Sequence, residues 1–229
     1  MLSLQKNAIF IADSHYNSKR VDLFNLLIKI KNREVETTQL YLMGDMFDFL
    51  TYKFNYFVKQ NQKVIDLINQ LSNEIEIIYF EGNHDFKIYK LFPNIKIIAR
   101  EQQPLKIVYK DKNISLSHGD IFTPKIYDIF TKLIRSDLFI SIINFIDINF
   151  WFSKKLEYKL LNKKICHKQK GFDDFIKERV ESYASDLIIE GHYHQGVIKD
   201  DYINVPSLAC DNRYIQFSKD IFSYRILKE

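Results

Sequence analysis

The sequence predicts an α/β fold in which two β-sheets pack face to face and helices cover the outside. In the first half of the chain, short apolar runs alternate with segments of helical periodicity, which favours parallel strands joined by helices. Later, apolar β-type runs follow one another directly, which favours a second, more antiparallel sheet. With 229 residues, 46% of them hydrophobic, the chain is long enough to bury the core of one domain.

The expected elements of the first half follow from apolar spacing. Ala8–Ala12 is a continuous apolar run, typical of a buried strand. The apolar residues of Val21–Lys31 recur at helical spacing and predict a helix that covers the sheet. We then expect a strand at Gln39–Met43, a helix with Val64, Leu67, Ile68 and Leu71 on its apolar face, and a strand at Glu74–Phe80.

The second half is richer in strands. The expected strands are Ile95–Ile98, Leu105–Tyr109, Ile114–Ser117, Asp186–Glu190, Tyr202–Val205, Tyr214–Phe217 and Phe222–Leu227, with a helix ending at Tyr183 before the fourth of them. The stretch 123–170 is longer than a connection needs and has few strand signals. We therefore expect a single domain, 1–229, that carries a helical cap insertion at 123–170.

Charge and cysteine content exclude several classes of protein. The net charge of +4 permits an anionic partner but selects none. Cys166 and Cys210 form no Cys-x-x-Cys motif, which argues against a disulfide framework and for a reducing compartment. The apolar run Leu138–Phe152 is too short to span a bilayer, and Met1–Asn7 lacks the pattern of a signal peptide. We expect a cytoplasmic protein.

Polar residues beside glycine follow five of the apolar runs. Five of the six histidines stand at such strand ends, and only His167 does not. In extended backbone, residues two apart point the same way, so Asp13 and His15 can share one target, and the same spacing recurs in His192 and His194. One such histidine is more often an ordinary loop residue than a ligand, but five in matching contexts predict a common site.

This set of side chains suits a pair of divalent cations. Imidazole and carboxylate ligands without thiolate fit Mn, Fe, Zn or similar ions. Two cations about 4 Å apart need a bridging anion, which an aspartate supplies, and such a pair clamps a phosphoryl group and activates water. The sequence therefore predicts a phosphoester hydrolase.

The five blocks resemble those of the calcineurin-like metallophosphoesterases, in the order of that family. They are Asp13-x-His15, Gly44-Asp45, Gly82-Asn83-His84-Asp85, His118-Gly119-Asp120 and Gly191-His192-x-His194. The resemblance implies that Asp13, His15 and His194 hold a first metal, that Asn83, His118 and His192 hold a second, and that Asp45 bridges them. It also implies that His84 lies over the substrate phosphate as a catalytic residue, that Asp85 orients His84 through a hydrogen bond, and that Mn²⁺ is the expected ion.

The insertion bears on the substrate. Its apolar positions at roughly helical spacing are followed by lysines, as an amphiphilic anionic substrate at a membrane would require. On pattern alone, a helical hairpin packed on the body with a solvated lysine face is an equal alternative. An apolar insertion at this place resembles the UDP-2,3-diacylglucosamine diphosphatases of lipid A biosynthesis. That resemblance implies a lipid-linked sugar nucleotide split into UMP and 2,3-diacylglucosamine 1-phosphate, and contact with the inner face of the cytoplasmic membrane.

The substrate-binding candidates are Asn83, His84 and the insertion lysine Lys164. His84 is a departure, because the better-known branch of the diphosphatases has arginine there and this chain has the residue of the wider family. The alternatives are a soluble phosphodiesterase or nucleotide pyrophosphohydrolase with a merely structural insertion, and a catalytically inactive binding scaffold. The scaffold is disfavoured because no ligand position is lost. We expect no nucleic-acid partner, since few aromatic residues accompany the lysines.

Overall fold

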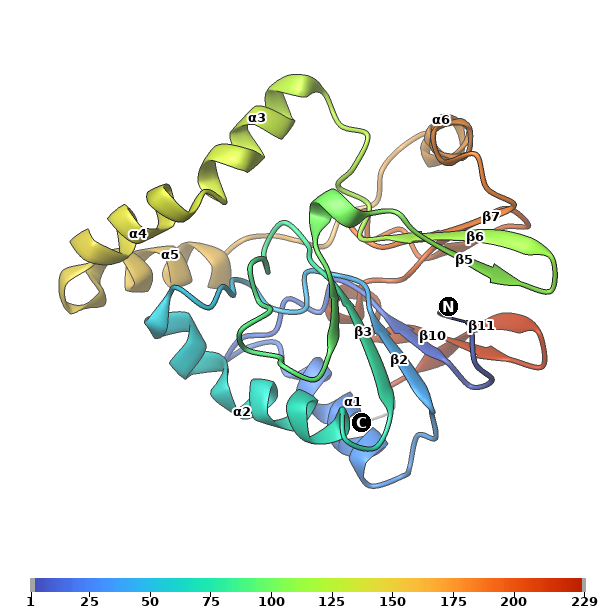
Figure 1. Cartoon of the computed structure of the whole chain (residues 1–229), viewed down its shortest axis with the longest axis horizontal. Coiled ribbons are helices and arrows are strands. Elements are labelled where there is room, and N and C mark those ends of the chain that lie inside the picture. The colour runs from blue at the N-terminus through green and yellow to red at the C-terminus, as the bar shows by residue number, and fades with distance from the viewer. Residues whose placement is uncertain (1–2, 228–229) are drawn as a thin grey trace.

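The computed structural model describes residues 3–227 and shows two mixed β-sheets packed face to face with helices outside (Figure 1). This confirms the predicted fold class. Within the described residues, the first sheet has the order β11-β10-β1-β2-β3-β4, and the second has the order β5-β6-β7-β9-β8.

The first sheet is parallel over β1 to β4, and β10 and β11 extend it antiparallel from β1. Its strands are β1 (Ile9–Ile11), β2 (Gln39–Leu42), β3 (Glu76–Phe80), β4 (Lys96–Ile98), β10 (Arg213–Ser218) and β11 (Ile221–Ile226). These strands agree with the predicted positions to within one or two residues.

The second sheet differs from the expectation of a more antiparallel sheet. Its strands are β5 (Leu105–Tyr109), β6 (Lys112–Ser117), β7 (Leu187–Glu190), β8 (Val197–Ile198) and β9 (Tyr202–Asn204). The central strands β6, β7 and β9 are parallel, and only the edge strands β5 and β8 pair antiparallel. The reason is that long connections cross over from β6 to β7, whereas the consecutive strands β10 and β11 join the first sheet instead.

Alternation along the strands builds the core. In β1, Phe10 faces the second sheet, whereas Ile9 and Ile11 face the helices. The layer between the sheets contains Phe10, Tyr41 and Ile78 from one sheet and Leu116, Ile189 and Ile203 from the other. Each central strand is therefore buried on both faces, which explains its continuous apolar sequence.

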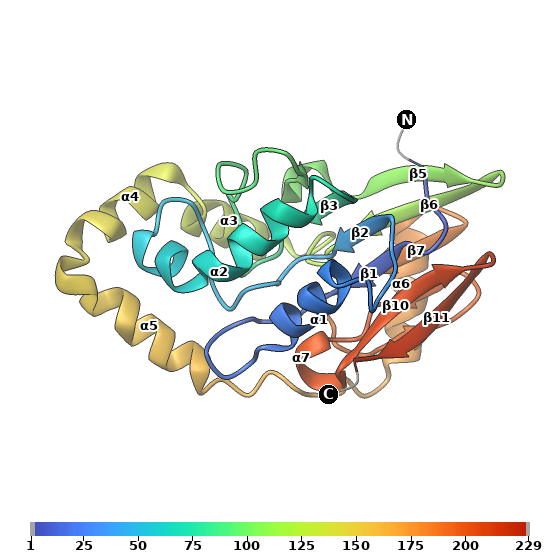
Figure 2. The ribbon, with the colours of Figure 1, turned by 90° about the horizontal axis from the view of Figure 1, so that it is seen from below.

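Helices α1 (Asp22–Lys31) and α2 (Asn55–Leu71) cover the outer face of the first sheet, and α6 (Phe172–Tyr183) covers the second (Figures 1 and 2). The short helix α7 (Leu208–Asp211) precedes β10, and a 3₁₀ turn, η1 (Arg100–Gln102), precedes β5. Among the described residues, no helix combines the length and the apolar character needed to cross a membrane.

The stretch predicted as an insertion contains α3 (Lys125–Ile134), α4 (Asp137–Ile146), η2 (Ile148–Phe150) and α5 (Trp151–Leu161). These helices, which we call the cap, project from one end of the sandwich (Figure 1). Ile140 of α4 is buried among Phe54, Phe57 and Phe86 of the body. Asp137 at the start of α4 forms ion pairs with Lys53 and Lys87, with N–O distances of 2.9 and 2.8 Å.

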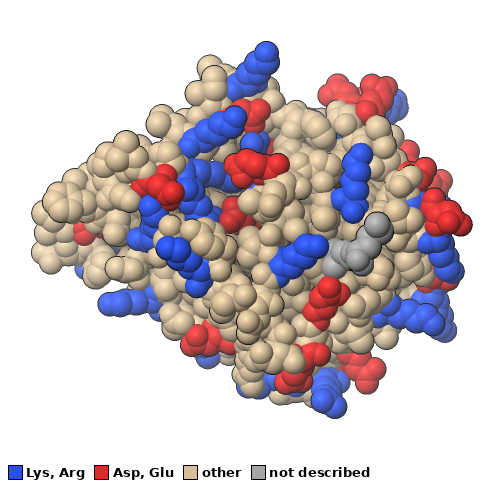
Figure 3. Space-filling model, in the orientation of Figure 1, with Lys and Arg blue, Asp and Glu red and all other residues tan. Residues whose placement is uncertain are grey.

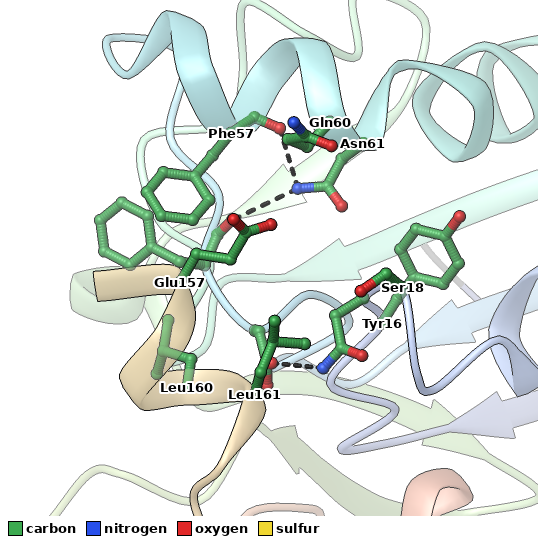
Figure 4. A pocket seen from close by; sticks show the side chains of 11 residues that line it. Tyr16, Ser18, Phe57, Gln60, Asn61, Glu157, Leu160 and Leu161 are labelled. Carbon is green, nitrogen blue, oxygen red and sulfur yellow. Dashed lines mark hydrogen bonds between the residues drawn. The ribbon is translucent and has the colours of Figure 1, made fainter. Parts of the chain in front are cut away.

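On its other side the cap is less closely packed. A cavity of about 220 Å³ lies between α5, α2 and the turn at 16–18, and Leu160 and Leu161 face Tyr16 and Ser18 across it (Figure 4). The contacts between cap and body here include the 2.6 Å hydrogen bond that Tyr56 donates to Glu157.

Cys166 and Cys210 are joined in a disulfide bond. The expectation of a chain without a disulfide is therefore wrong. The two residues are 44 positions apart, and they meet because the segment that returns from the cap runs beside α7. Spacing in the sequence could not show this proximity.

Candidate metal centre

The chemistry-bearing residues lie at the carboxyl ends of five strands. The parallel strands β1, β2 and β3 end at the same edge of the first sheet, and β6 and β7 end at the facing edge of the second. The residues that follow them are Asp13, His15, Asp45, Asn83, His84, His118, His192 and His194. Packing of the two sheets brings these edges together, as the carboxyl ends of α/β sheets commonly form ligand sites.

Two groups of ligand atoms converge there. Asp13, His15 and His194 form the first group, and Asp45, His118 and His192 form the second, with the ligand atoms of each group within 4.8 Å of one another. Asp45 also forms a group with His15, so it lies between the two sets.

Asn83 completes the set of predicted ligands, because its Oδ1 lies 3.2 Å from His118 Nε2. The structure thus brings together the seven residues that the resemblance assigned to metal binding.

His192 and His194 do not share one target, although they are two residues apart. His194 joins the first group and His192 the second. The extended backbone assumed from the sequence is absent here, since φ is 65° at His192 and 56° at His194, both in the left-handed region. Asp13 and His15 do converge, but also with left-handed φ values of 50° and 41°.

Left-handed backbone is therefore common among the predicted ligands. Asp45, with φ of 54°, is a fifth predicted ligand in the left-handed region, which non-glycine residues rarely occupy. Each such residue costs about 1–3 kcal/mol and persists where the surrounding structure imposes it. The fold thus stabilises a constellation that local preference alone would not form.

The geometry fits a bound cation. Asp13 Oδ1 is buried without a hydrogen-bond partner among the described residues, and it lies 3.4 Å from His194 Nε2. His118 Nε2 similarly lies 3.6 Å from Asp45 Oδ1. Two ligand atoms that each lie about 2.1 Å from one ion are separated by roughly 3–3.5 Å in tetrahedral or octahedral geometry. These distances match the spacing expected for shared coordination.

Hydrogen bonds to backbone carbonyls orient two of the histidines. His118 Nδ1 lies 2.9 Å from Met43 O, and His194 Nδ1 lies 3.1 Å from Ile165 O. Because a carbonyl oxygen only accepts, Nδ1 carries a proton in each ring, and Nε2 is the ring atom that would bind a metal after losing its own proton. Support of this kind is typical of metal-binding histidines.

The charge around the site also favours cations. Burial opposes ionisation of Asp45, but the neighbouring His118, His84 and His15 hold its pKa well below the usual value. Burial likewise opposes protonation of His118, but the carboxylates of Asp45 and Asp120 raise its pKa to about 9. The buried site is thus rich in negative charge, which a bound cation would neutralise.

The orientation of His84 corrects one expectation. Asp85 does not bond to the His84 ring; instead, His84 Nδ1 lies 2.6 Å from the backbone carbonyl of Asp48. The Asp85 carboxylate accepts hydrogen bonds from the amides of Asp45, Met46 and Gly82 and from the hydroxyl of Tyr79. Asp85 therefore fixes the turns that carry Asp45 and Asn83. Burial and the nearby Asp45 raise its pKa to about 6.

A cavity of about 220 Å³ opens over the candidate metal ligands. Its lining includes His84, Asn83, Lys164 and the neighbouring Lys163, whose Nζ lies 3.5 Å from His84 Nε2. The predicted substrate-binding residues thus share one cavity, and Lys163 is the lysine nearer to the His84 ring. The run of lysines in the sequence predicted that this segment binds phosphate. Only the folded structure shows which lysine of the run lies beside His84.

A buried cluster behind the second group was not predicted. Arg179 of α6 forms a 2.6 Å ion pair with Glu190, which ends β7 immediately before Gly191 and His192. Arg179 also donates to the carbonyls of Gly119 and Ile121, beside His118. It therefore joins the two turns that carry His118 and His192. The only sign of this cluster in the sequence was that Arg179, a charged residue, lies on the otherwise apolar face of α6.

Fold and site together define a metal-dependent phosphoester hydrolase. The family model for the calcineurin-like phosphoesterases matches residues 7–196, and the chain belongs to that family.

Curated relatives share modest identity over most of their length. The chain is 28% identical over 204 residues to a UDP-2,3-diacylglucosamine hydrolase of Haemophilus influenzae strain PittGG, covering 84% of this chain and 85% of the relative. It is 29% identical over 219 residues to a protein of the same name from Vibrio atlanticus, covering 89% of this chain and 84% of the relative. Among solved structures, the Escherichia coli phosphoesterase Yfce matches with a TM-score of 0.47 and 14% identity, covering 95% of this chain and 91% of the other.

Proposed function

We propose that this protein hydrolyses the pyrophosphate bond of UDP-2,3-diacylglucosamine, releasing UMP and 2,3-diacylglucosamine 1-phosphate. The names of the curated relatives support this reaction. The observation in this chain that carries the proposal is an apolar cavity that begins beside the metal-binding residues.

That cavity, of about 140 Å³, lies between the cap and the body. Phe139, Ile140 and Ile143 of α4 line it from the cap, and Phe86 and Asn83 line it from the body. Asn83 lines the polar cavity over the metal-binding residues as well. One substrate could therefore place a phosphate at the polar end and an acyl chain at the apolar end, which a soluble nucleotide would leave empty.

The proposed centre holds two divalent ions, with Mn²⁺ as the expected metal. Asp13, His15 and His194 would bind one ion, Asn83, His118 and His192 the other, and Asp45 both. When bound, the ions neutralise charge on the phosphoryl group and activate the attacking water.

The chain's own groups bind and orient the substrate. The bond between His84 Nδ1 and Asp48 O leaves Nε2 free on the cavity side, near Lys163. Because Nδ1 already holds one proton, it is the doubly protonated His84 ring that would donate a hydrogen bond or a proton from Nε2 to a phosphate oxygen. Lys163 and Lys164 would pair with the pyrophosphate, and Lys164 is the substrate-binding lysine that the sequence predicted.

The outer face of the cap supports contact with a membrane surface. Ile126, Leu138, Phe145, Ile148 and Trp151 are each at least 66% exposed. Much of the projecting end is free of charged side chains on the face that Figure 3 shows. Exposed apolar surface on this scale is unusual for a protein without a partner, and Lys154 and Lys155 beside it suit anionic headgroups. We propose that the cap rests on the inner face of the cytoplasmic membrane.

A substrate comparison tests the proposed reaction. Metal-loaded protein in mixed micelles should release UMP from UDP-2,3-diacylglucosamine, with much lower kcat/KM for UDP-glucosamine without acyl chains. The control is Asp45→Ala, which should turn over neither the acylated nor the unacylated compound, because it lacks the side chain proposed to bind both metals. Equal turnover of the acylated and unacylated compounds would favour a soluble nucleotide pyrophosphohydrolase and contradict the lipid assignment.

A further inference from the structure

The segment that returns from the cap, residues 162–168, supports His194 at more than one point. The carbonyl of Ile165 accepts the hydrogen bond of His194 Nδ1, at 3.1 Å. Lys168 Nζ donates to the carbonyls of His194 and Gln195, at 2.7 and 3.0 Å. The segment thus fixes both the ring and the backbone of one predicted ligand of the first metal.

Helix α7 supports the other side of the same metal site. The Ser207 hydroxyl, at the start of α7, donates to the carbonyl of Asp13 at 2.8 Å. The amide of Leu208 donates to the carbonyl of Ala12 at 3.0 Å. The first metal site is therefore bounded by two supports, the return segment behind His194 and α7 behind Asp13.

The Cys166–Cys210 disulfide joins these two supports. Cys166 follows Ile165 in the return segment and Cys210 lies in α7, with their Cα atoms 5.5 Å apart. Cys210 Sγ lies 3.9 Å from His194 Nδ1. The parallel ion pair between Lys168 and Asp211, at 3.3 Å, is partly exposed on the lysine side and contributes little by itself. The covalent bond is thus the strongest tie between the two supports.

The second metal site has supports of its own, although the amide of His192 also donates to Asp13 Oδ2, at 2.8 Å. His118 is oriented by the carbonyl of Met43, and the turns of His118 and His192 are joined by Arg179 and Glu190. A change at the disulfide should therefore reach the first metal site before the second.

We propose that the Cys166–Cys210 disulfide positions His194, and that its reduction weakens the first metal site while leaving the second in place. This inference rests on the dinuclear centre of the proposed function. Reduction adds two electrons and two protons, one of each to each sulfur, and a dithiol reductant that supplies them becomes a disulfide itself. Cys166 and Cys210 are positioning residues in this scheme, and the enzyme would be most active when oxidised.

Metal binding tests the inference without any substrate. Metal-free protein is titrated with Mn²⁺ in two forms, air-oxidised and reduced with a phosphine that is then removed under anaerobic conditions. Calorimetry gives the affinities, and electron paramagnetic resonance distinguishes a coupled Mn²⁺ pair from a single ion. We expect reduction to weaken one of the two sites by about tenfold or more, as loss of support around a metal ligand commonly does. The Cys166→Ser/Cys210→Ser variant should match the reduced protein and should not respond to the phosphine.

A matched control separates positioning from loss of stability. Val64→Ala, in the buried face of α2, should lower the melting temperature without changing either Mn²⁺ affinity. Equal Mn²⁺ affinities in the oxidised and reduced forms would overturn this inference and leave the proposed dinuclear centre intact. Two free thiols in the denatured air-oxidised protein would have the same consequence. Failure of the oxidised protein to bind Mn²⁺ at all would overturn the dinuclear centre and this inference together.

Discussion

At the scale of single residues, the site depends on side chains whose partners are backbone groups. His84, His118 and His194 are each oriented through Nδ1 by a carbonyl oxygen, from Asp48, Met43 and Ile165 respectively. A carbonyl on a buried turn moves less than a long side chain does, so the free Nε2 atoms are held in a narrow range of positions. This preorganisation favours binding and catalysis over adaptability.

The first residue-scale prediction concerns His84. His84→Ala should lower kcat by about 10²–10⁴-fold, the usual contribution of a general acid or base, and should leave the content of bound metal unchanged. Glu178→Ala, on the exposed face of α6 and away from this cavity, is the control and should leave both kcat and bound metal unchanged. Rates measured with the acylated substrate at saturation check this. A His84→Ala enzyme within tenfold of the parent would contradict a catalytic role.

A second residue-scale prediction concerns Glu81, which is 5% exposed. Burial raises its pKa to about 7 from an ordinary 4.5. The folded state therefore keeps a proton that the unfolded state loses between these values, so the free energy of unfolding falls as pH rises from about 4.5 to 7. Glu81→Gln has no carboxyl group to ionise. The difference in free energy of unfolding between variant and parent should therefore be more favourable to the variant at pH 8 than at pH 4.5, by up to about 3 kcal/mol.

Urea denaturation of parent and variant at both pH values measures this difference. Glu178→Gln, on the exposed face of α6, is the control and should show no pH-dependent difference from the parent. If the Glu81→Gln difference were the same at both pH values, Glu81 would not titrate as described.

At the scale of elements, the turns after the strands leave little free space. A Cβ atom at Gly82 would lie 2.2 Å from Asp45 Oδ1, so glycine is required there by close approach to a predicted ligand. Gly82→Ala should displace Asp45 and weaken Mn²⁺ binding, because Asp45 is the residue that we propose binds both metals.

Gly171→Ala is the matched control for this prediction. Gly171 has φ of +70° and open space around its Cβ position, so alanine there should cost about 1 kcal/mol of stability through backbone strain alone. Calorimetric titration with Mn²⁺ should therefore show weaker binding for Gly82→Ala and unchanged binding for Gly171→Ala. The opposite order would contradict the placement of Asp45.

Within the cap, the structure separates two phenylalanines that the sequence alone treats alike. Phe139 lines the apolar cavity, whereas Phe145 is 86% exposed. Phe139→Ala should lower kcat/KM for the acylated substrate by about tenfold to a hundredfold, the equivalent of about 1.5–3 kcal/mol of lost apolar contact. Phe145→Ala should have little effect in detergent micelles. A small chromogenic phosphodiester serves as control, and equal losses on both substrates for Phe139→Ala would indicate destabilisation instead.

Most strands and helices, and the convergence of the candidate metal ligands, could be predicted from the sequence for a physical reason. Strands such as Ile9–Ile11 are buried on both faces and therefore read as continuous apolar runs, and residues after such strands must meet where the sheets end. Partners distant in sequence could not be predicted. The disulfide, the bond between His84 and Asp48, and the Arg179–Glu190 pair all depend on how separate segments pack. The parallel centre of the second sheet was missed for the same reason, since pairing direction depends on the crossover.

At the scale of the whole molecule, the distribution of exposed apolar residues is uneven. The cap carries most of the strongly exposed ones, whereas the far end of the sandwich carries a few, such as Ile221 and Ile226 of β11. Figures 1 and 2 place the cap and β11 at opposite ends of the molecule. The uneven distribution agrees with the membrane contact that we propose for the cap.

This arrangement predicts vesicle binding through the cap. The parent should co-float with vesicles that contain anionic phosphatidylglycerol, and Phe145→Ser/Trp151→Ser should bind much more weakly because each substitution removes apolar area from the contact. Ile221→Ser/Ile226→Ser is the matched control, with similarly exposed residues at the opposite end, and should bind as the parent does. Equal binding by both variants would show that the cap is not the docking surface.

The position of the cap between two paired strands has a consequence for how such enzymes diversify. β6 and β7 are hydrogen-bonded neighbours over the register from Ile114–Leu187 to Ser117–Glu190, although the entire cap lies between them in the chain. No cap residue takes part in this pairing, so we expect that the connection can be changed without disturbing the strands that precede His118 and His192. Natural variation or recombination at this one junction could thus supply a conserved hydrolytic centre with new specificities, and exchange of caps between relatives is a direct route to engineering them.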